Sequence, residues 1–543
     1  MIRRLLCLAL PLLAAIAFVP SPAAAEATVD TAAEPTIATV AEPAGSAAGP
    51  VRIVPEPSSL HTLPGQNYTL TTFTRIVVPA HSPDAAAAAD YLASVLRPST
   101  GYRLPVTSGF GLPGDIRFDL AAPGSLGEEG YRLNVTPLGV AISAHASAGL
   151  FYGVQTLRQL FPATVEASSV QNGPWRAAGV AISDQPRFAW RGAMLDVARH
   201  FYTVSQVEDY LNLLSMYKIN VLHLHLSDNE GWRIYINGWD RLATYGGSTN
   251  VDGGPGGYYT QADYTNIVRY AQAHHVMIVP EIDTPGHVTA AQASYADLNC
   301  DGIAPPLLAP GYSSLCIPDP TTYQFLDAVV GQIAALTPWP YFDMGGDEAL
   351  NTSATDYRTF VDRMQQIVRS HGKKLIGWHQ IEAGDLTGDE MVQYWGLAGS
   401  APDIALAQQA VARGNKIVMS PADRTYLDMA YNSSTIGQNW IGDPGYISVR
   451  DGYDWDPAGY VPGVGESDIA GVEAPEWTED LGTMSLVRYM ELPRLPGYAE
   501  IGWSPRSARD WNSYAVRLAA QGPRWDVMGV NYYHSAEVPW PTS

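Results

Sequence analysis

The sharpest chemical feature of this 543-residue sequence is a pair of neighbouring carboxylates, Asp347 and Glu348, directly after Gly345 and Gly346. Carboxylates that cleave glycosidic bonds ordinarily stand on opposite sides of the bond, about 5–5.5 Å apart for retention. Sequence neighbours leave the backbone in different directions and are poorly placed to flank a sugar. If Glu348 is a general acid, we expect Asp347 to hold a substrate group that is itself the nucleophile, and to help keep Glu348 protonated near neutral pH. The structural alternative is an acidic helix N-terminus after a glycine turn.

Polar and aromatic residues also follow five other segments that have the pattern of buried strands. These clusters occupy residues 223–233, 280–287, 378–380, 394–396 and 473–479. Indole rings stack on the apolar faces of sugars, and carboxylates accept hydrogen bonds from sugar hydroxyls. A carboxylate cleft lined with tryptophan therefore predicts a carbohydrate ligand.

These residues need a scaffold that gathers the ends of many strands. Strand-like apolar runs occupy residues 193–197, 220–226, 276–282, 341–344, 374–378, 391–394, 416–419 and 471–474. Amphipathic helical patterns lie between most of them, at residues 204–214, 262–275, 321–336, 353–371 and 401–414. The alternation predicts an α/β fold with a (β/α)8 TIM barrel over residues 186–543, whose active face lies at the C-terminal ends of the strands. The interval 423–468 is too long for a simple crossover, so we expect functional loop structure there.

A small α/β domain is predicted before the barrel, over residues 51–185. It combines strand patterns at 75–78 and 133–135 with helical patterns at 84–96 and 148–160. At the other end of the chain, residues 506–518 have the pattern of a final amphipathic helix that closes the barrel. Trp503 and Trp525 are expected to anchor terminal helices in the core.

The N-terminus predicts export. Arg3 and Arg4 precede an apolar run, and small residues follow it, so residues 1–25 have the pattern of a secretory signal peptide. Residues 26–50 contain no aromatic side chain and are expected to form a disordered Ala/Pro-rich linker. The sequence leaves open whether this linker tethers a secreted protein to the cell envelope.

Composition narrows the class of partner. The chain carries 32 Lys+Arg against 54 Asp+Glu, a formal charge of −22, which disfavours a nucleic-acid partner because phosphates need cationic side chains. No apolar run after the signal is long enough to span a membrane. Cys300 and Cys316 remain after signal removal, and an exported chain favours a disulfide between them, with two free buried thiols as the alternative.

The barrel segment resembles the family 20 glycoside hydrolases, the β-N-acetylhexosaminidases, and is most similar to secreted actinobacterial members. The resemblance spans residues from about 51 to 536. Its most specific parts are residues 191–201 (RGAMLDVARHF), the Gly-Gly-Asp-Glu turn at 345–348 and the Glu-Ala-Pro-Glu-Trp segment at 473–477. Members of this family use the substrate's own acetamido group instead of a protein nucleophile.

The resemblance implies a role for each matching residue. Glu348 would be the general acid and then the base, Asp347 would orient the 2-acetamido group, and Tyr426 would donate a hydrogen bond to the acetamide oxygen. Asp228 and His287 would tune the proton on Glu348. The implied sugar-binding residues are Arg191, Trp378, Trp395, Asp428, Trp440, Trp477 and Glu479, with Trp440 stacking on the leaving-group sugar. The reaction implies no cofactor.

Two features of the core segments qualify this assignment. Asp343 stands where the family usually has His, which places an extra carboxylate four residues before Asp347. His223 and His225 alternate along a strand and point the same way, which resembles a pair of metal ligands. No third ligand follows at metal-like spacing, so we expect buried barrel histidines and no metal.

The functional hypothesis is a secreted, exo-acting, retaining β-N-acetylhexosaminidase. It would remove terminal GlcNAc, with GalNAc left open, from chitin fragments or glycans through an oxazolinium intermediate. One alternative is a retaining β-glycosidase with Glu479 or Glu500 as nucleophile, and another is a non-catalytic glycan-binding protein. The sequence leaves chain length, pH optimum and oligomeric state open.

Overall fold

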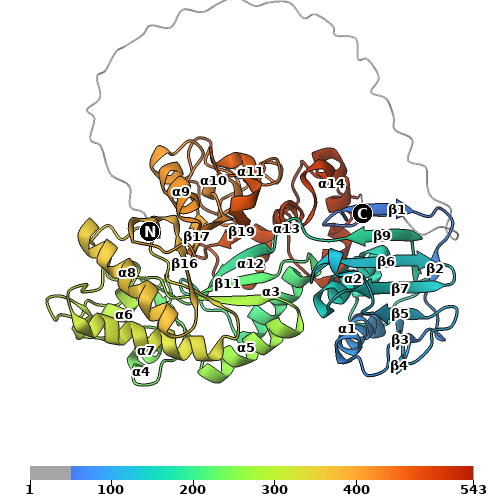
Figure 1. Ribbon diagram of the computed structural model, residues 1–543, viewed down its shortest axis with the longest axis horizontal. Coiled ribbons are helices and arrows are strands. Elements are labelled where there is room, and N and C mark those ends of the chain that lie inside the picture. The colour runs from blue at the N-terminus through green and yellow to red at the C-terminus, as the bar shows by residue number, and fades with distance from the viewer. Residues whose placement is uncertain (1–49, 542–543) are drawn as a thin grey trace, which may run out of the picture. The chain divides into compact units, whose positions relative to one another are not determined.

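The computed structural model describes residues 50–541, which begin with a mixed seven-stranded sheet (Figure 1). Its strand order is β1-β9-β6-β7-β5-β3-β4, parallel on the β7 to β4 side and antiparallel on the other. The strands are β1 (Ser59–Thr62), β3 (Ile76–Val78), β4 (Val106–Ser108), β5 (Ile116–Asp119), β6 (Tyr131–Thr136), β7 (Gly139–Ala144) and β9 (Val180–Asp184). A separate short pair joins β2 (Tyr68–Thr69) to β8 (Arg176–Ala177). The predicted signal peptide and nearly all of the predicted linker lie outside the described residues.

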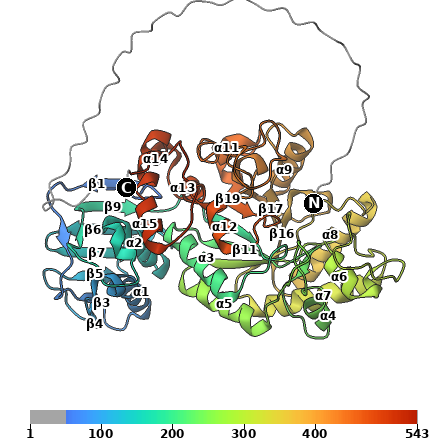
Figure 2. The ribbon, with the colours of Figure 1, turned by 180° about the vertical axis from the view of Figure 1, so that it is seen from behind.

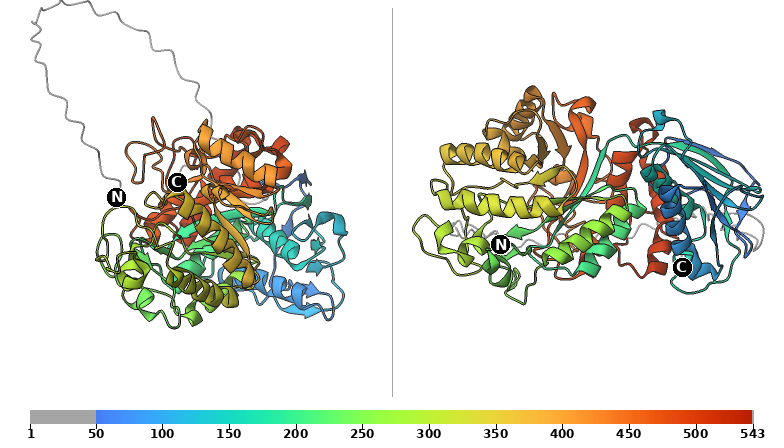
Figure 3. Two further views of the ribbon diagram at one scale, coloured as in Figure 1. Left: turned by 60° about the vertical axis from the view of Figure 1, so that its left-hand side comes forward. Right: turned by 60° about the horizontal axis from the view of Figure 1, so that its bottom comes forward.

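Two helices cover one face of this sheet, α1 (Pro83–Thr100) and α2 (Ser147–Leu160) (Figure 3). In α1, Ala85, Ala89, Leu92 and Leu96 recur at helical spacing and are fully buried. The small alanines let the helix approach the sheet closely. The predicted helices at 84–96 and 148–160 are therefore present with slightly wider bounds.

The second part is a closed barrel of eight parallel strands (Figure 2). They are β10 (Trp190–Asp196), β11 (Val221–His225), β14 (Met277–Glu281), β15 (Tyr341–Asp343), β16 (Lys374–Trp378), β17 (Met391–Tyr394), β18 (Lys416–Met419) and β19 (Ile469–Glu476). β10 pairs with both β11 and β19, which closes the ring. The predicted TIM barrel behind a small α/β domain is confirmed.

Helices outside the ring connect most of the strands. They are α3 (Val204–Met216), α5 (Gln261–Ala273), α7 (Pro320–Leu336), α8 (Ala354–Ser370) and α9 (Ala401–Arg413). In α8, the Ser353 side chain caps the first turn by accepting from the Asp356 amide, and Phe360, Val361 and Met364 are buried toward the barrel. Shorter helices are α4 (Asp240–Thr244), α6 (Thr289–Ser294), α10 (Ala422–Thr425) and α11 (Pro457–Tyr460).

Four helices follow the last strand, α12 (Met484–Glu491), α13 (Leu495–Trp503), α14 (Trp511–Ala519) and α15 (Gly522–Met528). The prediction of a single helix over residues 506–518 is wrong at its N-terminal end. Asp510 caps α14 by accepting from the Ser513 amide, so the helix begins at Trp511, and only a short 3-10 turn (Arg506–Ala508) precedes it. Trp503 and Trp525 are fully buried in α13 and α15, as expected.

A buried polar cluster joins the small domain to the barrel. The ammonium group of Lys218, which follows α3, donates to Asp184 at 3.1 Å and to the Tyr131 hydroxyl at 2.9 Å. Trp503 donates to the same Asp184 carboxylate at 3.0 Å. All four side chains are fully buried, so the partners satisfy one another.

The loop after α6 contains the predicted disulfide between Cys300 and Cys316. It closes a segment that leads into α7. Over residues 50–541, no helix combines the length and hydropathy that a membrane crossing requires.

Candidate active site

The Gly-Gly turn after β15 presents Asp347 and Glu348 at the C-terminal face of the barrel. Gly345 and Gly346 have φ values of +67° and +98°, a region that side chains rarely adopt. A Cβ on Gly345 would also lie 2.0 Å from Asp283 Oδ1, which accepts from the Gly346 amide at 3.1 Å. Because α8 begins only at Ala354, the two carboxylates lie on the turn that follows Gly345 and Gly346 and not at a helix N-terminus.

The two carboxylates have raised pKa values. Burial and the neighbouring Asp347 raise the pKa of Glu348, while His287 opposes this shift. Burial also raises the pKa of Asp347, again against His287. The Glu348 side chain is 41% exposed and Asp347 only 14%, so Glu348 is the one that faces solvent. A half-exposed carboxyl group with a raised pKa suits a general acid.

His287 and Asp228, the two residues that the family resemblance implies would tune the Glu348 proton, lie behind Glu348. His287 Nε2 lies 3.8 Å from both Glu348 Oε2 and Asp347 Oδ2. Its Nδ1 lies 3.2 Å from Asp228 Oδ1, and Asp228 Oδ2 lies 2.9 Å from His225 Nε2. Burial disfavours charge on His287, but Asp228, Asp283 and Asp347 outweigh it and raise its pKa well above the usual range. His287 therefore lies between Asp228 and the two carboxylates, and these neighbours favour its protonated form.

Aromatic side chains form a cluster near the two carboxylates, and we call the space that they border the pocket. The Trp477 ring lies 5.8 Å from the Trp378 ring and 6.2 Å from the Tyr426 ring. Trp440, from the long loop before β19, lies 6.0 Å from Tyr426 and 6.3 Å from Trp395, and is 40% exposed. The structure thus brings together all five predicted aromatic residues, with Trp440 at the rim. The expectation of functional loop structure between residues 423 and 468 fits this placement.

Hydrogen-bonding groups line the same pocket. Asp428 and Glu479 each have a buried carboxylate oxygen without a hydrogen-bond partner among the described residues, as does Asp347 through Oδ1. Burial raises the pKa of both Asp428 and Glu479. Arg199 stands beside them, with Nη2 3.9 Å from Glu479 Oε1 and its guanidinium 5.0 Å from the centre of the Trp477 ring. These acceptors and one cation match the hydroxyl groups of a sugar.

Comparisons with known proteins agree with this geometry. The family model "Glycosyl hydrolase family 20, catalytic domain" matches residues 188–357 and 350–506, and the model of domain 2 of the same family matches residues 51–185. The chain belongs to glycoside hydrolase family 20. It is a β-N-acetylhexosaminidase, as the sequence resemblance implied.

Several relatives align with about nine tenths of this chain. It is 39% identical to a β-N-acetylhexosaminidase of Cellulomonas fimi over 90% of this chain and 97% of the relative. It is similar to the solved β-N-acetylhexosaminidase of Streptomyces coelicolor A3(2), with 52% identity, a TM-score of 0.87 and coverage of 90% and 99%. A mutant Streptomyces plicatus β-hexosaminidase, solved with the product GlcNAc, has the same identity and TM-score with coverage of 90% and 98%.

The assignment of Arg191 to the family 20 sugar site is wrong in this structure. Arg191 is the second residue of β10, at the N-terminal end of the barrel, and is 1% exposed. Its guanidinium donates to Glu129 of the small domain and to the carbonyls of Lys218 and Phe188. Arg199 is the arginine that the sequence reasoning missed. Its place just after the C-terminal end of β10 was the available signal, because active residues follow barrel strands.

Glu500, one of the two nucleophiles considered in the alternative mechanism, also lies elsewhere. It is fully buried in α13, where it forms ion pairs with Arg517 and accepts from the Tyr453 hydroxyl. Glu479 lies at the site but beside Arg199. Glu500 is therefore a structural carboxylate.

Proposed function

We propose that this β-N-acetylhexosaminidase is an exo-acting, retaining enzyme that removes terminal, non-reducing β-linked GlcNAc by substrate-assisted catalysis. Chitooligosaccharides and glycans are the proposed substrates. The observation that supports this most directly is Asp347 Oδ1, a buried acceptor without a hydrogen-bond partner in the described chain. Asp347 lies near Tyr426, whose ring belongs to a cluster with Trp477 and Trp378. Such an acceptor suits the N–H of an acetamido group whose methyl packs on indole. The Streptomyces plicatus relative that binds GlcNAc supports the choice of sugar.

The proposed reaction has two steps. Glu348 gives its proton to the glycosidic oxygen as the bond to C1 breaks, and the acetamide carbonyl oxygen bonds to C1 to form the oxazolinium ion. Asp347 accepts from the acetamide N–H and stabilises the positive charge, while the Tyr426 hydroxyl donates to the acetamide oxygen. Glu348 then takes a proton from water as the water oxygen attacks C1, and the C1–acetamide bond breaks. Two inversions at C1 give net retention.

Exo action is supported by a group of polar side chains beside the aromatic cluster. Arg199, Asp428 and Glu479 lie close together and offer hydrogen-bonding groups for the hydroxyls of a terminal sugar. Trp440 at the rim would stack on the next sugar, outside the pocket.

The test compares two aryl β-glycosides that differ only at C2, one acetamido and one hydroxyl. We expect turnover of the acetamido sugar alone, and a β-configured product at early times by NMR. Equal turnover of both would mean that a protein nucleophile exists and that Asp347 has another role. Binding of both without turnover would favour the glycan-binding alternative. Asp347→Asn is the matched variant, and it should lower kcat on the acetamido substrate.

We also propose that the protein is secreted after cleavage near residue 25. Support comes from the signal-like N-terminal sequence and from the Cys300–Cys316 disulfide, since disulfides persist in oxidising compartments. The test is the intact mass of the protein recovered from culture medium. A mass that includes residues 1–25, or recovery only inside cells, would refute the proposal; recovery only with the envelope would favour a tethered form.

A further inference from the structure

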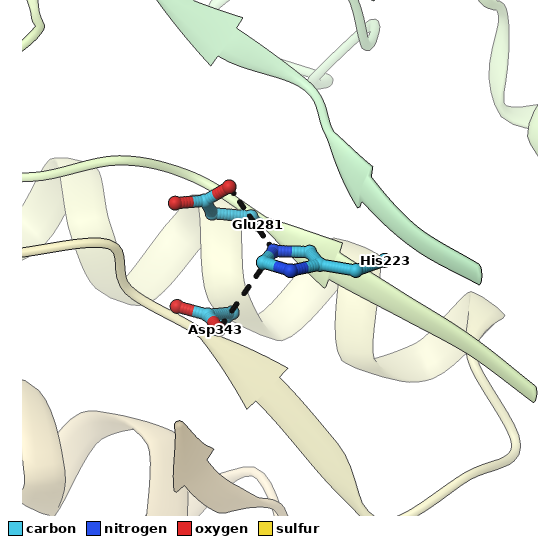
Figure 4. Close-up of side chains that lie close together, drawn as sticks. All are labelled: His223, Glu281 and Asp343. Atoms are coloured by element: carbon cyan, nitrogen blue, oxygen red, sulfur yellow. Dashed lines mark ion pairs between the residues drawn. The ribbon is translucent and has the colours of Figure 1, made fainter. Parts of the chain in front are cut away.

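Three polar side chains from adjacent barrel strands converge beneath the tryptophan wall: His223 of β11, Glu281 of β14 and Asp343 of β15 (Figure 4). His223 Nε2 lies 3.0 Å from Glu281 Oε2 and 3.7 Å from Asp343 Oδ2. One ligand atom from each residue lies within 4.8 Å of the others, and each residue is at most 1% exposed. Buried carboxylates are costly unless they are paired, and the groups that pair with these two are His223 and, for Glu281, also His225.

The free nitrogen of His223 points between the two carboxylates. In the described part of the chain, His223 Nε2 is a buried atom with no hydrogen-bond partner, although Glu281 Oε2 is 3.0 Å away. Figure 4 shows Glu281 and Asp343 on either side of this edge of the imidazole ring. The nitrogen therefore faces both carboxylates, with Glu281 Oε2 the nearer of the two oxygens.

The other nitrogen of His223 has a fixed partner. Its Nδ1 lies 2.8 Å from Glu473 Oε1, an oxygen that also accepts from Gln393 at 2.9 Å, while Glu473 Oε2 accepts from Trp190 at 2.9 Å. When an ion is bound, a proton held on Nδ1 by this carboxylate would leave Nε2 as the lone-pair donor. Metal-binding histidines characteristically have this second-sphere carboxylate.

We propose that His223 Nε2, Glu281 Oε2 and Asp343 Oδ2 bind a divalent transition-metal ion, and that zinc fits best. A tetrahedral site with bonds of about 2.0–2.1 Å separates its ligands by roughly 3.3 Å, which lies between the two measured separations from Nε2. A nitrogen donor in an enclosed site favours zinc over magnesium or calcium, which prefer oxygen ligands and keep waters. The two carboxylates neutralise the charge of the ion.

The sequence pattern could not reveal this site. Linear spacing offered His223 and His225 as a pair, but both nitrogens of His225 already face carboxylates and His225 is not a proposed ligand. Its Nδ1 pairs with Glu281 Oε2, so this oxygen would bind the ion through its other lone pair, and its Nε2 pairs with Asp228. The three ligands come from three strands and lie next to one another only because the barrel pairs β11 with β14 and β14 with β15.

The proposed ion would have a structural role and would lie below the sugar-binding residues, away from the reacting atoms. Glu281 Oε1 accepts from Trp378 Nε1 at 3.2 Å, so an ion on Oε2 would fix the carboxylate that orients one wall of the sugar pocket. It would not contact the substrate. The inference is therefore independent of the proposed substrate-assisted mechanism.

The test measures zinc directly. The purified mature chain is unfolded in chelator, refolded with or without Zn²⁺, passed through a desalting column and analysed for metal. We expect about one zinc per wild-type chain and less than about one in ten for Asp343→Asn and His223→Gln, since binding of a buried ion is coupled to folding. His371→Gln is the control, because His371 pairs with Asp327 at 2.9 Å on the surface and should not affect the count.

Replacement by Co²⁺ gives a second readout that needs no variant. A four- or five-coordinate nitrogen–oxygen site would produce visible d–d absorption in wild type, whereas loosely bound hexaaqua cobalt would not. Refolded wild type with less than about one zinc in ten chains and no such band would overturn the proposal. A full equivalent that persists in both folded variants would also overturn it, because the ion would then lie elsewhere.

Discussion

The two arginines near β10 allow a sharp test, because Arg191→Met should lower stability and Arg199→Met should lower activity. Arg191 is 1% exposed and its guanidinium donates to Glu129 and to two backbone carbonyls. Removing one partner of a buried ion pair costs about 3–5 kcal/mol, and we expect the lower value because the Glu129 side chain is 19% exposed and can regain water. At about 2 °C per kcal/mol for a large domain, the apparent Tm should fall by roughly 6 °C.

Arg199 should have the opposite profile. If its guanidinium makes two charge-assisted hydrogen bonds to sugar hydroxyls, each contributing about 1.5–3 kcal/mol, its loss should lower kcat/KM by ~10²–10⁴-fold. Arg199 also lies 2.8 Å from Asp228, so the loss could act through that carboxylate instead. Substrates that lack the 3- or 4-hydroxyl separate the two effects. If Arg199 acts by binding that hydroxyl, Arg199→Met should cause little further loss of kcat/KM on such a substrate, because the interaction is already absent in wild type.

The assays are thermal unfolding followed by tryptophan fluorescence, and steady-state hydrolysis of an aryl acetamido glycoside at 25 °C, where both variants are folded. We expect Arg191→Met to keep kcat/KM within about twofold of wild type, because it lies at the opposite end of the barrel. The reasoning would be refuted if folded Arg191→Met lost activity as Arg199→Met does, or if Arg199→Met were as active as wild type.

Three further predictions concern the pocket. Glu348→Gln should lower kcat by ~10²–10⁴-fold for substrates with a poor leaving group and far less for a dinitrophenyl leaving group, which needs no protonation; equal losses on both would contradict the general-acid role. Asp228→Asn removes the carboxylate that most raises the pKa of His287, and it also removes a smaller direct effect of Asp228 that raises the pKa values of Glu348 and Asp347. Because His287 influences both carboxylates more than Asp228 does, loss of its positive charge should move both limbs of the kcat/KM–pH profile to higher pH. A shift to lower pH would contradict the arrangement. Trp440→Ala should raise KM for a chitooligosaccharide while leaving KM for a small aryl glycoside nearly unchanged, and an equal change in both would exclude stacking outside the pocket.

The barrel strands were predictable because they are buried on both faces. In β10, β11 and β17 every residue is buried, and apolar residues make up most of each strand. The predicted bounds consequently differ from the observed ones by a few residues at most. The C-terminal helices were harder, because the break after Arg506–Ala508 depends on the cap at Asp510 and not on hydrophobic periodicity.

The sequence could predict those site residues that lie just after a barrel strand. It could not predict those whose position depends on side-chain direction or on which strands pair. Asp347, Glu348 and Trp378 stand directly after or at the end of strands, so the barrel topology alone places them on the active face. Arg191 and Arg199 occur in one motif, and only the strand bounds distinguish them. The grouping of His223 with Asp343 depends on strand pairing, which no single segment encodes.

The cluster around Lys218 makes the two folded parts inseparable for protein engineering. A barrel expressed from residue 186 would lack Tyr131 and Asp184, the partners of a fully buried ammonium group, and would expose the face that they now cover. The small domain would in turn present Asp184 without Lys218 and Trp503. Chimeras that recombine catalytic barrels with foreign accessory modules should therefore be cut before residue 51, so that both parts are inherited together.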